Sequence, residues 1–153
     1  GPFEKGAAQR WPILPIFKEI ACLMIHVMQT SSRVSSIIEK QPGFVGASLK
    51  EHIRPFVWYL EQELVMPSDD VRNVFLKAPD LFGLSYAEVM KPTMDYFIED
   101  LRFGKKWMAK MLKSFPQLLC YSLEDNIKAK IQWLKDRVGV SDIDMKTALK
   151  FQK

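Results

Sequence analysis

Apolar residues recur every three or four positions along most of this chain, with polar residues between them. This spacing puts the apolar side chains on one face of an α-helix. The pattern is clearest in residues 105–141, where it falls into two halves. The first half carries the apolar set Trp107, Met108, Met111, Leu112 and Phe115. The second half carries Ile127, Ile131, Leu134 and Val138. Strict alternation is not sustained anywhere, so the pattern predicts helices and no strands.

Residues that stop and start helices separate the two halves. Pro116 ends the first helix because it has no backbone N–H, and it biases Phe115 away from the α region. Ser122 is placed to cap the second helix, with Asp125 three residues later. Gly139 suits the position after the helix end. The segment therefore reads as helix, short apolar link, helix.

The same unit is written three times. Pro42, Pro79 and Pro116 are separated by one interval (79−42 = 37 and 116−79 = 37). Other positions keep the same phase: Ser48, Ser85 and Ser122; Ile53, Met90 and Ile127; Leu60, Phe97 and Leu134; Leu64, Leu101 and Val138. Tandem units of this length contact only their neighbours and build an extended surface, which favours binding over catalysis.

The repeat also sets the domain organisation. Residues 14–153 form a helical-repeat domain with links centred on Pro42, Pro79 and Pro116, and residues 1–13 form an N-terminal extension or cap. Residues 14–27 occupy the slot of a second helix. Residues 141–153 occupy that of a first helix, with Met145, Ala148 and Leu149 as its apolar stripe. The predicted fold is all-α, a right-to-left curved solenoid of tandem helical repeats.

Two prolines fall early in the second helices. Pro55 and Pro92 share a register, and Ala129 takes their place in the last copy. Since proline fits best in a first turn, we expect these helices to start a residue or two after Ser48 and Ser85, or to bend.

Composition excludes several classes of function. Hydrophobic residues make up 48% and charged residues 26%, which is ordinary for a soluble globular domain. No apolar run is long enough for a membrane span. Cys22 and Cys120 lie in apolar runs and are expected to be buried thiols. No metal-ligand spacing, phosphate loop or nucleophile elbow is present, so we expect neither an enzyme nor a cofactor.

The repeat unit resembles that of the mitochondrial transcription termination factor (mTERF) family. The similarity is strongest in LKSFPQLLCYSLEDNIKAKIQWLKDRVGVS, clear in VFLKAPDLFGLSYAEVMKPTMDYFIEDLRF and weaker in IIEKQPGFVGASLKEHIRPFVWYLEQEL. The unit here is longer than is usual in the family, and the array is shorter. The resemblance implies a curved helical solenoid that binds organellar double-stranded DNA or RNA, in mitochondria or chloroplasts. The implied roles are transcription termination or regulation, RNA maturation and ribosome assembly.

Positive charge is concentrated toward the C-terminus. Residues 1–90 contain nine Lys or Arg against ten Asp or Glu (9−10 = −1), and residues 91–153 contain thirteen against eight (13−8 = +5). One candidate for phosphate contact is a column at the repeat interval, Arg54, Lys91 and Lys128. A second is the face formed by Lys106, Lys110 and Lys113, flanked by Lys105, with Lys130 on the following helix.

Alternatives stay open for both candidates. Lysines on the outer face of an amphipathic helix are commonly just solvated. Trp58, Trp107 and Trp133 could stack on bases, but their helical spacing favours a core role, as does that of Met90, Met94, Met108 and Met111. The second hypothesis for the whole chain is a structural or adaptor subunit of an organellar ribosome or other large organellar assembly, which docks through protein contacts.

Overall fold

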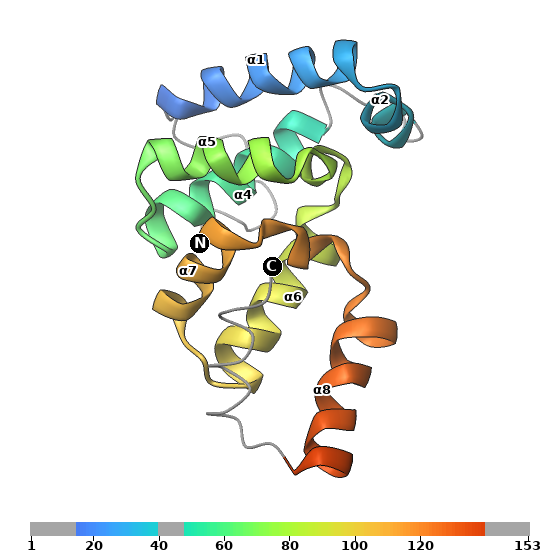
Figure 1. Ribbon diagram of the computed structural model, residues 1–153. Coiled ribbons are helices and arrows are strands. Elements are labelled where there is room, and N and C mark those ends of the chain that lie inside the picture. The colour runs from blue at the N-terminus through green and yellow to red at the C-terminus, as the bar shows by residue number, and fades with distance from the viewer. Residues whose placement is uncertain (1–14, 40–47, 140–153) are drawn as a thin grey trace.

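The computed structural model describes residues 15–39 and 48–139, and every regular element in those two ranges is helical (Figure 1). This confirms the predicted all-α repeat architecture. The first helices of successive units are α2 (Ser32–Glu39), α5 (Ser68–Lys77) and α7 (Lys105–Ser114). The links are short 3₁₀ helices, η4 (Pro79–Gly83) and η7 (Pro116–Cys120). Helix α1 (Pro15–Thr30) takes the second-helix slot ahead of α2, as the repeat predicts.

Each later second helix is a continuous run of three segments, a short α-helix between two π-helical turns. The three runs are η2 (Ser48–Ile53), α4 (Arg54–Trp58) and η3 (Tyr59–Glu63); η5 (Tyr86–Met90), α6 (Lys91–Asp95) and η6 (Tyr96–Asp100); and η8 (Leu123–Lys128), α8 (Ala129–Trp133) and η9 (Leu134–Val138). The units stack in chain order, from α1 at the top of Figure 1 to α8 at the bottom.

The predicted start of two second helices is confirmed. The hydroxyl oxygens of Ser85 and Ser122 accept hydrogen bonds from the backbone N–H groups of Glu88 (3.2 Å) and Asp125 (3.1 Å). The residues before the prolines, Ala78 and Phe115, have left the α region, with φ of −135° and −143°. Serine and proline therefore place the helix boundaries as the local chemistry requires.

Pro55 and Pro92 were expected to delay or bend the second helices, but the structure shows no delayed start at Pro92. In the second of these units the helix begins directly after Ser85, and Pro92 lies inside it. The turn before each proline is π-helical, which uses bonds between residues five apart rather than four. This turn lies close to a residue that has no N–H to donate in the regular α-helical hydrogen bond. It also occurs before Ala129, so proline exploits this geometry without being its only cause.

The apolar stripes form one continuous core that runs through the units. Val71, Val74 and Phe75 of α5 are fully buried, and the rings of Phe75 and Phe82 stack at 4.7 Å between centroids. Neighbouring units share aromatic contacts, such as Phe97 against Trp107 at 5.3 Å. The core methionines are buried as predicted: Met90, Met94, Met108 and Met111.

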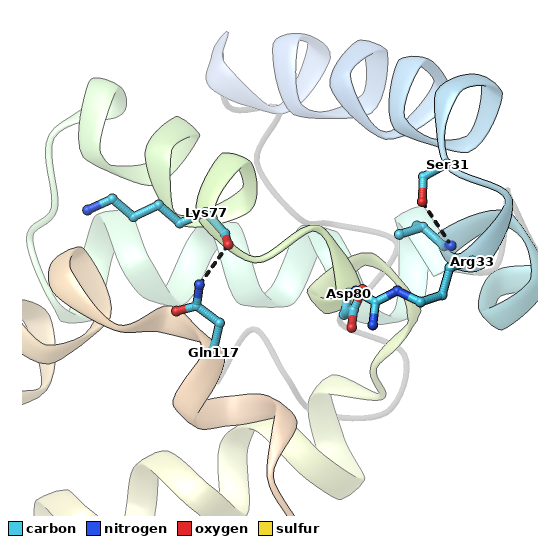
Figure 2. A network of polar contacts seen from close by, with 6 residues as sticks. Ser31, Arg33, Lys77, Asp80 and Gln117 are labelled. Carbon is cyan, nitrogen blue, oxygen red and sulfur yellow. Dashed lines mark hydrogen bonds and ion pairs between the residues drawn. The ribbon is translucent and has the colours of Figure 1, made fainter. Parts of the chain in front are cut away.

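Polar contacts tie the two described links, η4 and η7, to the first helix of the unit before each (Figure 2). The Gln117 side-chain amide of η7 donates to the Lys77 carbonyl at the end of α5 (2.8 Å). The carboxylate at the same register in η4, Asp80, pairs with Arg33 of α2 (2.7 Å). Lys77 donates in turn to the Lys113 carbonyl at the end of α7 (2.5 Å). The bonds to the Lys77 and Lys113 carbonyls use groups that helix ends leave free. Together with the Asp80–Arg33 ion pair, they hold neighbouring units in phase.

A repeated backbone feature follows each of the three second helices after α1, and the sequence predicts it only in the last copy, at Gly139. Val65, Arg102 and Gly139 share one register, and all three have positive φ, of 50°, 58° and 73°. Val65 and Arg102 are each followed by a residue whose N–H donates back into the helix. Met66 donates to the carbonyl of Leu60 (2.9 Å), and Phe103 donates to the carbonyl of Phe97 (3.0 Å). The last copy carries the residue that this conformation favours, whereas Val65 is β-branched and strained there.

Two expectations about side chains are wrong. Cys22 and Cys120 are exposed rather than buried, because each lies on the outward side of its helix. At Cys120 the thiol is still screened enough from water that burial raises its pKa to about 11. Trp107 is buried as predicted and Trp58 partly so, but Trp133 is 57% exposed. The predicted extension (residues 1–13), the link at Pro42 and the helix predicted for 141–153 lie outside the described residues.

We expect Val65→Gly to raise the free energy of unfolding by about 1 kcal/mol, because glycine adopts positive φ without the Cβ clash. Val65 is 79% exposed, so the change removes little packing. Chemical denaturation of the purified chain measures the effect. The reciprocal variant Gly139→Val places valine at the same register and should lower stability by a similar amount. Equal stability of Val65→Gly and the parent would contradict the strain.

Candidate nucleic-acid interface

The sequence predicts the column of Arg54, Lys91 and Lys128 near the start of each second helix, whereas in the structure it lies near the middle. Arg54 and Lys91 open α4 and α6, and Lys128 closes η8. All three residues are half-buried. They therefore sit at the edge of the core and not out on the surface.

Each cation of the column already has a partner within the chain. The Arg54 guanidinium lies over the Phe17 ring of α1, 4.8 Å from its centroid. Lys91 pairs with Asp95 at 2.7 Å, one turn along the same helix. Lys128 pairs with Glu124 at 2.7 Å and lies 5.4 Å from the centroid of the Tyr96 ring. The hydrogen bond to Glu124 raises the pKa of the Lys128 ammonium, which stays charged.

These contacts give the column a structural role. Phe17 and Tyr96 belong to the second helix of the preceding unit in each case, so Arg54 and Lys128 bridge neighbouring second helices. Cation–π contacts of this kind are worth about 0.5–1 kcal/mol at exposed sites. A phosphate that approached the column would compete with them.

The lysines of α7 divide into two pairs. Lys105 and Lys113 turn toward earlier units: Lys105 meets Glu63 at the end of η3 at 2.9 Å, and Lys113 meets Asp70 of α5 at 3.5 Å. Lys106 and Lys110 are exposed and form no ion pair within the described part of the chain. We call Lys106 and Lys110 the α7 lysine pair. Lys130 of α8 is also exposed.

Helix α7 differs in charge from α5, its counterpart one unit earlier. Helix α5 has Asp69 and Asp70 in its first turn, where acidic groups suit the positive end of the helix dipole. Helix α7 has four lysines and no acidic residue, and Lys105 and Lys106 occupy that first turn. Neither helix has a side-chain cap, because the N-cap residue is Pro67 in α5 and Gly104 in α7. The start of α7 is therefore distinguished by its positive charge, which favours anions and opposes the helix dipole.

The sequence model of the mTERF family matches residues 15–152, which is most of the chain. This chain belongs to the mTERF family. No curated protein and no solved structure shows a significant match to it. Proteins of the mTERF family bind nucleic acid and act in organellar gene expression, and they are generally not catalytic.

In residues 15–39 and 48–139 of this mTERF chain, no helix has the length and apolar character needed to cross a bilayer. Nor do the described residues bring together three side chains of the types that hold a metal ion.

Sequence reasoning found the cations but not their pairing. Some signal was present: Lys91 and Asp95, like Glu124 and Lys128, are four residues apart and share a helix face. By contrast, 42 positions separate Lys105 from Glu63. Only the stacking of units brings that pair together, so the sequence could not separate the paired lysines of α7 from the unpaired ones.

Charge reversal should therefore have opposite effects at two lysines. Lys91→Glu puts a carboxylate beside Asp95 and should lower the free energy of unfolding by about 0.5 kcal/mol or more. Lys106→Glu puts one in the first turn of α7 and should raise it by about 0.3–1 kcal/mol. Urea titrations at low ionic strength would measure both. Destabilisation by Lys106→Glu as large as that by Lys91→Glu would contradict the assignment of Lys106 as unpaired.

Proposed function

We propose that this mTERF protein is a non-catalytic nucleic-acid-binding protein of organellar gene expression, and that the α7 lysine pair is its principal phosphate contact. The observation that carries the proposal is the reversal of charge between the first turns of α5 and α7. The family binds nucleic acid, and α7 is the described first helix where cations replace the acidic residues of its neighbour.

The partners of the other cations support this choice. A carboxylate already pairs with each of four other lysines, which are Lys91, Lys105, Lys113 and Lys128. A lysine that binds phosphate from such a pair leaves its carboxylate unpaired, which offsets part of the gain. Lys106 and Lys110 carry no such cost, so each adds its full counterion-release contribution to binding. Lys130 adds a third exposed cation on the next helix.

The repeat column keeps a secondary part in the proposal. Arg54, Lys91 and Lys128 recur once per unit, and a ladder of cations would follow a nucleic-acid backbone along the array. Their half-buried positions and internal partners favour a small contribution from each. The proposed ligand is organellar double-stranded DNA or RNA, in mitochondria or chloroplasts, in transcription termination or another step of RNA metabolism.

A second candidate function has its own supporting observation. Trp133 and Tyr121 are 57% and 44% exposed near the C-terminal end of the described array. Exposed aromatic residues are typical anchors of protein–protein interfaces. They favour the alternative of a structural or adaptor subunit of an organellar ribosome or another organellar assembly.

The decisive variant transplants the residues of α5 into α7. Lys106→Asp with Lys110→Asn gives α7 the side chains of Asp69 and Asn73, which lie at the same register (69+37 = 106 and 73+37 = 110). The fold tolerates these residues one unit earlier, so the variant should stay folded. Binding to duplex DNA or RNA, followed by fluorescence anisotropy across a salt series, should weaken. On duplex DNA the slope of log K against log salt should fall by about 2.

The matched control is Lys18→Asp with Lys50→Asn, which makes the same two changes at exposed lysines of the N-terminal part. It should bind as the parent does. If the triple variant Arg54→Gln, Lys91→Gln, Lys128→Gln lost binding while the α7 variant kept it, the repeat column would be the interface instead. Absence of salt-dependent binding by the parent to duplex DNA, structured RNA and single-stranded RNA would favour the adaptor function.

A further inference from the structure

Residues four positions apart form a line along the second helix of the last described unit. Such residues are neighbours on one face of a helix. The line consists of Asp125, Ala129, Trp133 and Arg137, and all four residues are exposed. We call these four residues the terminal ridge. Its order along the chain is acidic, small, aromatic and basic.

The two preceding second helices carry a line at the same register, but with different charges. Their members are Glu51, Pro55, Tyr59 and Glu63 in one unit and Glu88, Pro92, Tyr96 and Asp100 in the next (59+37 = 96 and 96+37 = 133). Both earlier lines have an aromatic residue at the third position and an acidic residue at each end. The terminal ridge keeps the aromatic residue and replaces the second acidic residue with a basic one.

In the earlier units the following second helix covers this line. Tyr59 is 7% exposed, and its ring lies 6.4 Å from that of Tyr86 in the next second helix. Tyr96 is half-buried, and the Lys128 Nζ of the next second helix lies 5.4 Å from its ring centroid. No described second helix follows the terminal ridge, and Trp133 is 57% exposed. The register that packs against another helix in the earlier units is thus open here.

The terminal ridge is complementary to its own reverse. When two copies pack antiparallel about a two-fold axis, the numbers of facing residues have one sum (125+137 = 262 and 129+133 = 262). Asp125 then faces Arg137 of the other copy at both ends of the contact. Trp133 faces Ala129, whose small side chain leaves room for the indole ring. A parallel pair would oppose like charges, and the lines of the two earlier units would do so in either direction.

The surroundings of the terminal ridge suit this pairing. Neither Asp125 nor Arg137 forms an ion pair within the described part of the chain. Ala129 and Trp133 both line an open groove of about 560 Å³, whose walls include Phe115. The groove therefore offers apolar surface beside Ala129, where the indole ring of a second copy would lie.

We propose that two copies of this chain associate through their terminal ridges, antiparallel and about a two-fold axis. Each array then continues at its C-terminal end into the other. One face of one helix from each chain is a small interface, so the dimer is weak and depends on concentration. The proposal does not depend on nucleic-acid binding, and it gives the exposed aromatic surface of the last unit a second copy as its occupant.

Charge reversal at either end of the terminal ridge should weaken the dimer. Sedimentation equilibrium at low ionic strength, where ion pairs are least screened, measures its dissociation constant. Asp125→Arg places two cations together at both ends of the contact, and Arg137→Asp places two carboxylates there. Each change should raise the dissociation constant about tenfold or more. Trp133→Ala should also weaken the dimer, without a change of charge.

Exchanging the two charges should restore the dimer. A chain with both Asp125→Arg and Arg137→Asp again has opposite charges across the two-fold axis, so it should dimerise as the parent does. An equimolar mixture of the two single variants should form a heterodimer, because one chain then has two cations on its ridge and the other has two carboxylates. A merely structural effect of the single variants would not be reversed in this way.

The matched control is Glu88→Arg, which makes the same change of charge one unit earlier (88+37 = 125). Both acidic residues are exposed, and the backbone N–H of each donates to a capping serine. The control should therefore affect the helix as Asp125→Arg does, while the dimer stays as in the parent. Circular dichroism of each variant shows that the helices are retained.

Three outcomes would overturn the proposal. The first is a parent chain that stays monomeric at every concentration. The second is a dimer that survives both single charge reversals, because another face would then hold it. The third is equal weakening by Glu88→Arg and Asp125→Arg, which would show that net charge, and not the terminal ridge, controls association.

Discussion

Each unit of this protein has an apolar face that only its neighbour can cover. A single helix–link–helix unit buries one side of its second helix, and the first helix of the next unit buries the other. The contact of Phe97 with Trp107 across that boundary is the clearest case. The rest of the structure depends on this mutual burial, because a stacked array gains stability from interfaces and not from isolated units.

Burial alone does not set the phase in which units stack, since apolar contact has no direction. Directional groups supply the phase. The two described links reach back by a hydrogen bond or an ion pair, from Gln117 to the Lys77 carbonyl and from Asp80 to Arg33. After each of the three later second helices, one residue with positive φ turns the chain. At Val65 that turn is made at the cost of backbone strain, which suggests that the geometry of stacking outweighs local preference there.

The same stacking divides the cations into two classes. Contacts between units engage Lys105 and Lys113 with carboxylates of earlier units, and Arg54 and Lys128 with the preceding second helix. These side chains help to hold the solenoid together. Lys106 lies in the first turn of α7, which contains no acidic residue, and Lys110 lies one turn further along the same exposed face. Under the proposed function, these two exposed cations are the ones available for phosphate contact.

The sequence by itself determined the repeat, its helices and most of its core. Proline, serine and the spacing of apolar residues act within a few positions of one another, so the boundaries at Ser85, Pro116 and Ser122 follow from local chemistry. Only the tertiary structure decided which lysines are paired and that Trp133 lies open. The positive φ at Val65 and Arg102 also became apparent only in the tertiary structure. Those properties depend on which side chains of another unit pack against a residue. The contacting residues are about forty positions apart, so no local sequence pattern reveals the contact.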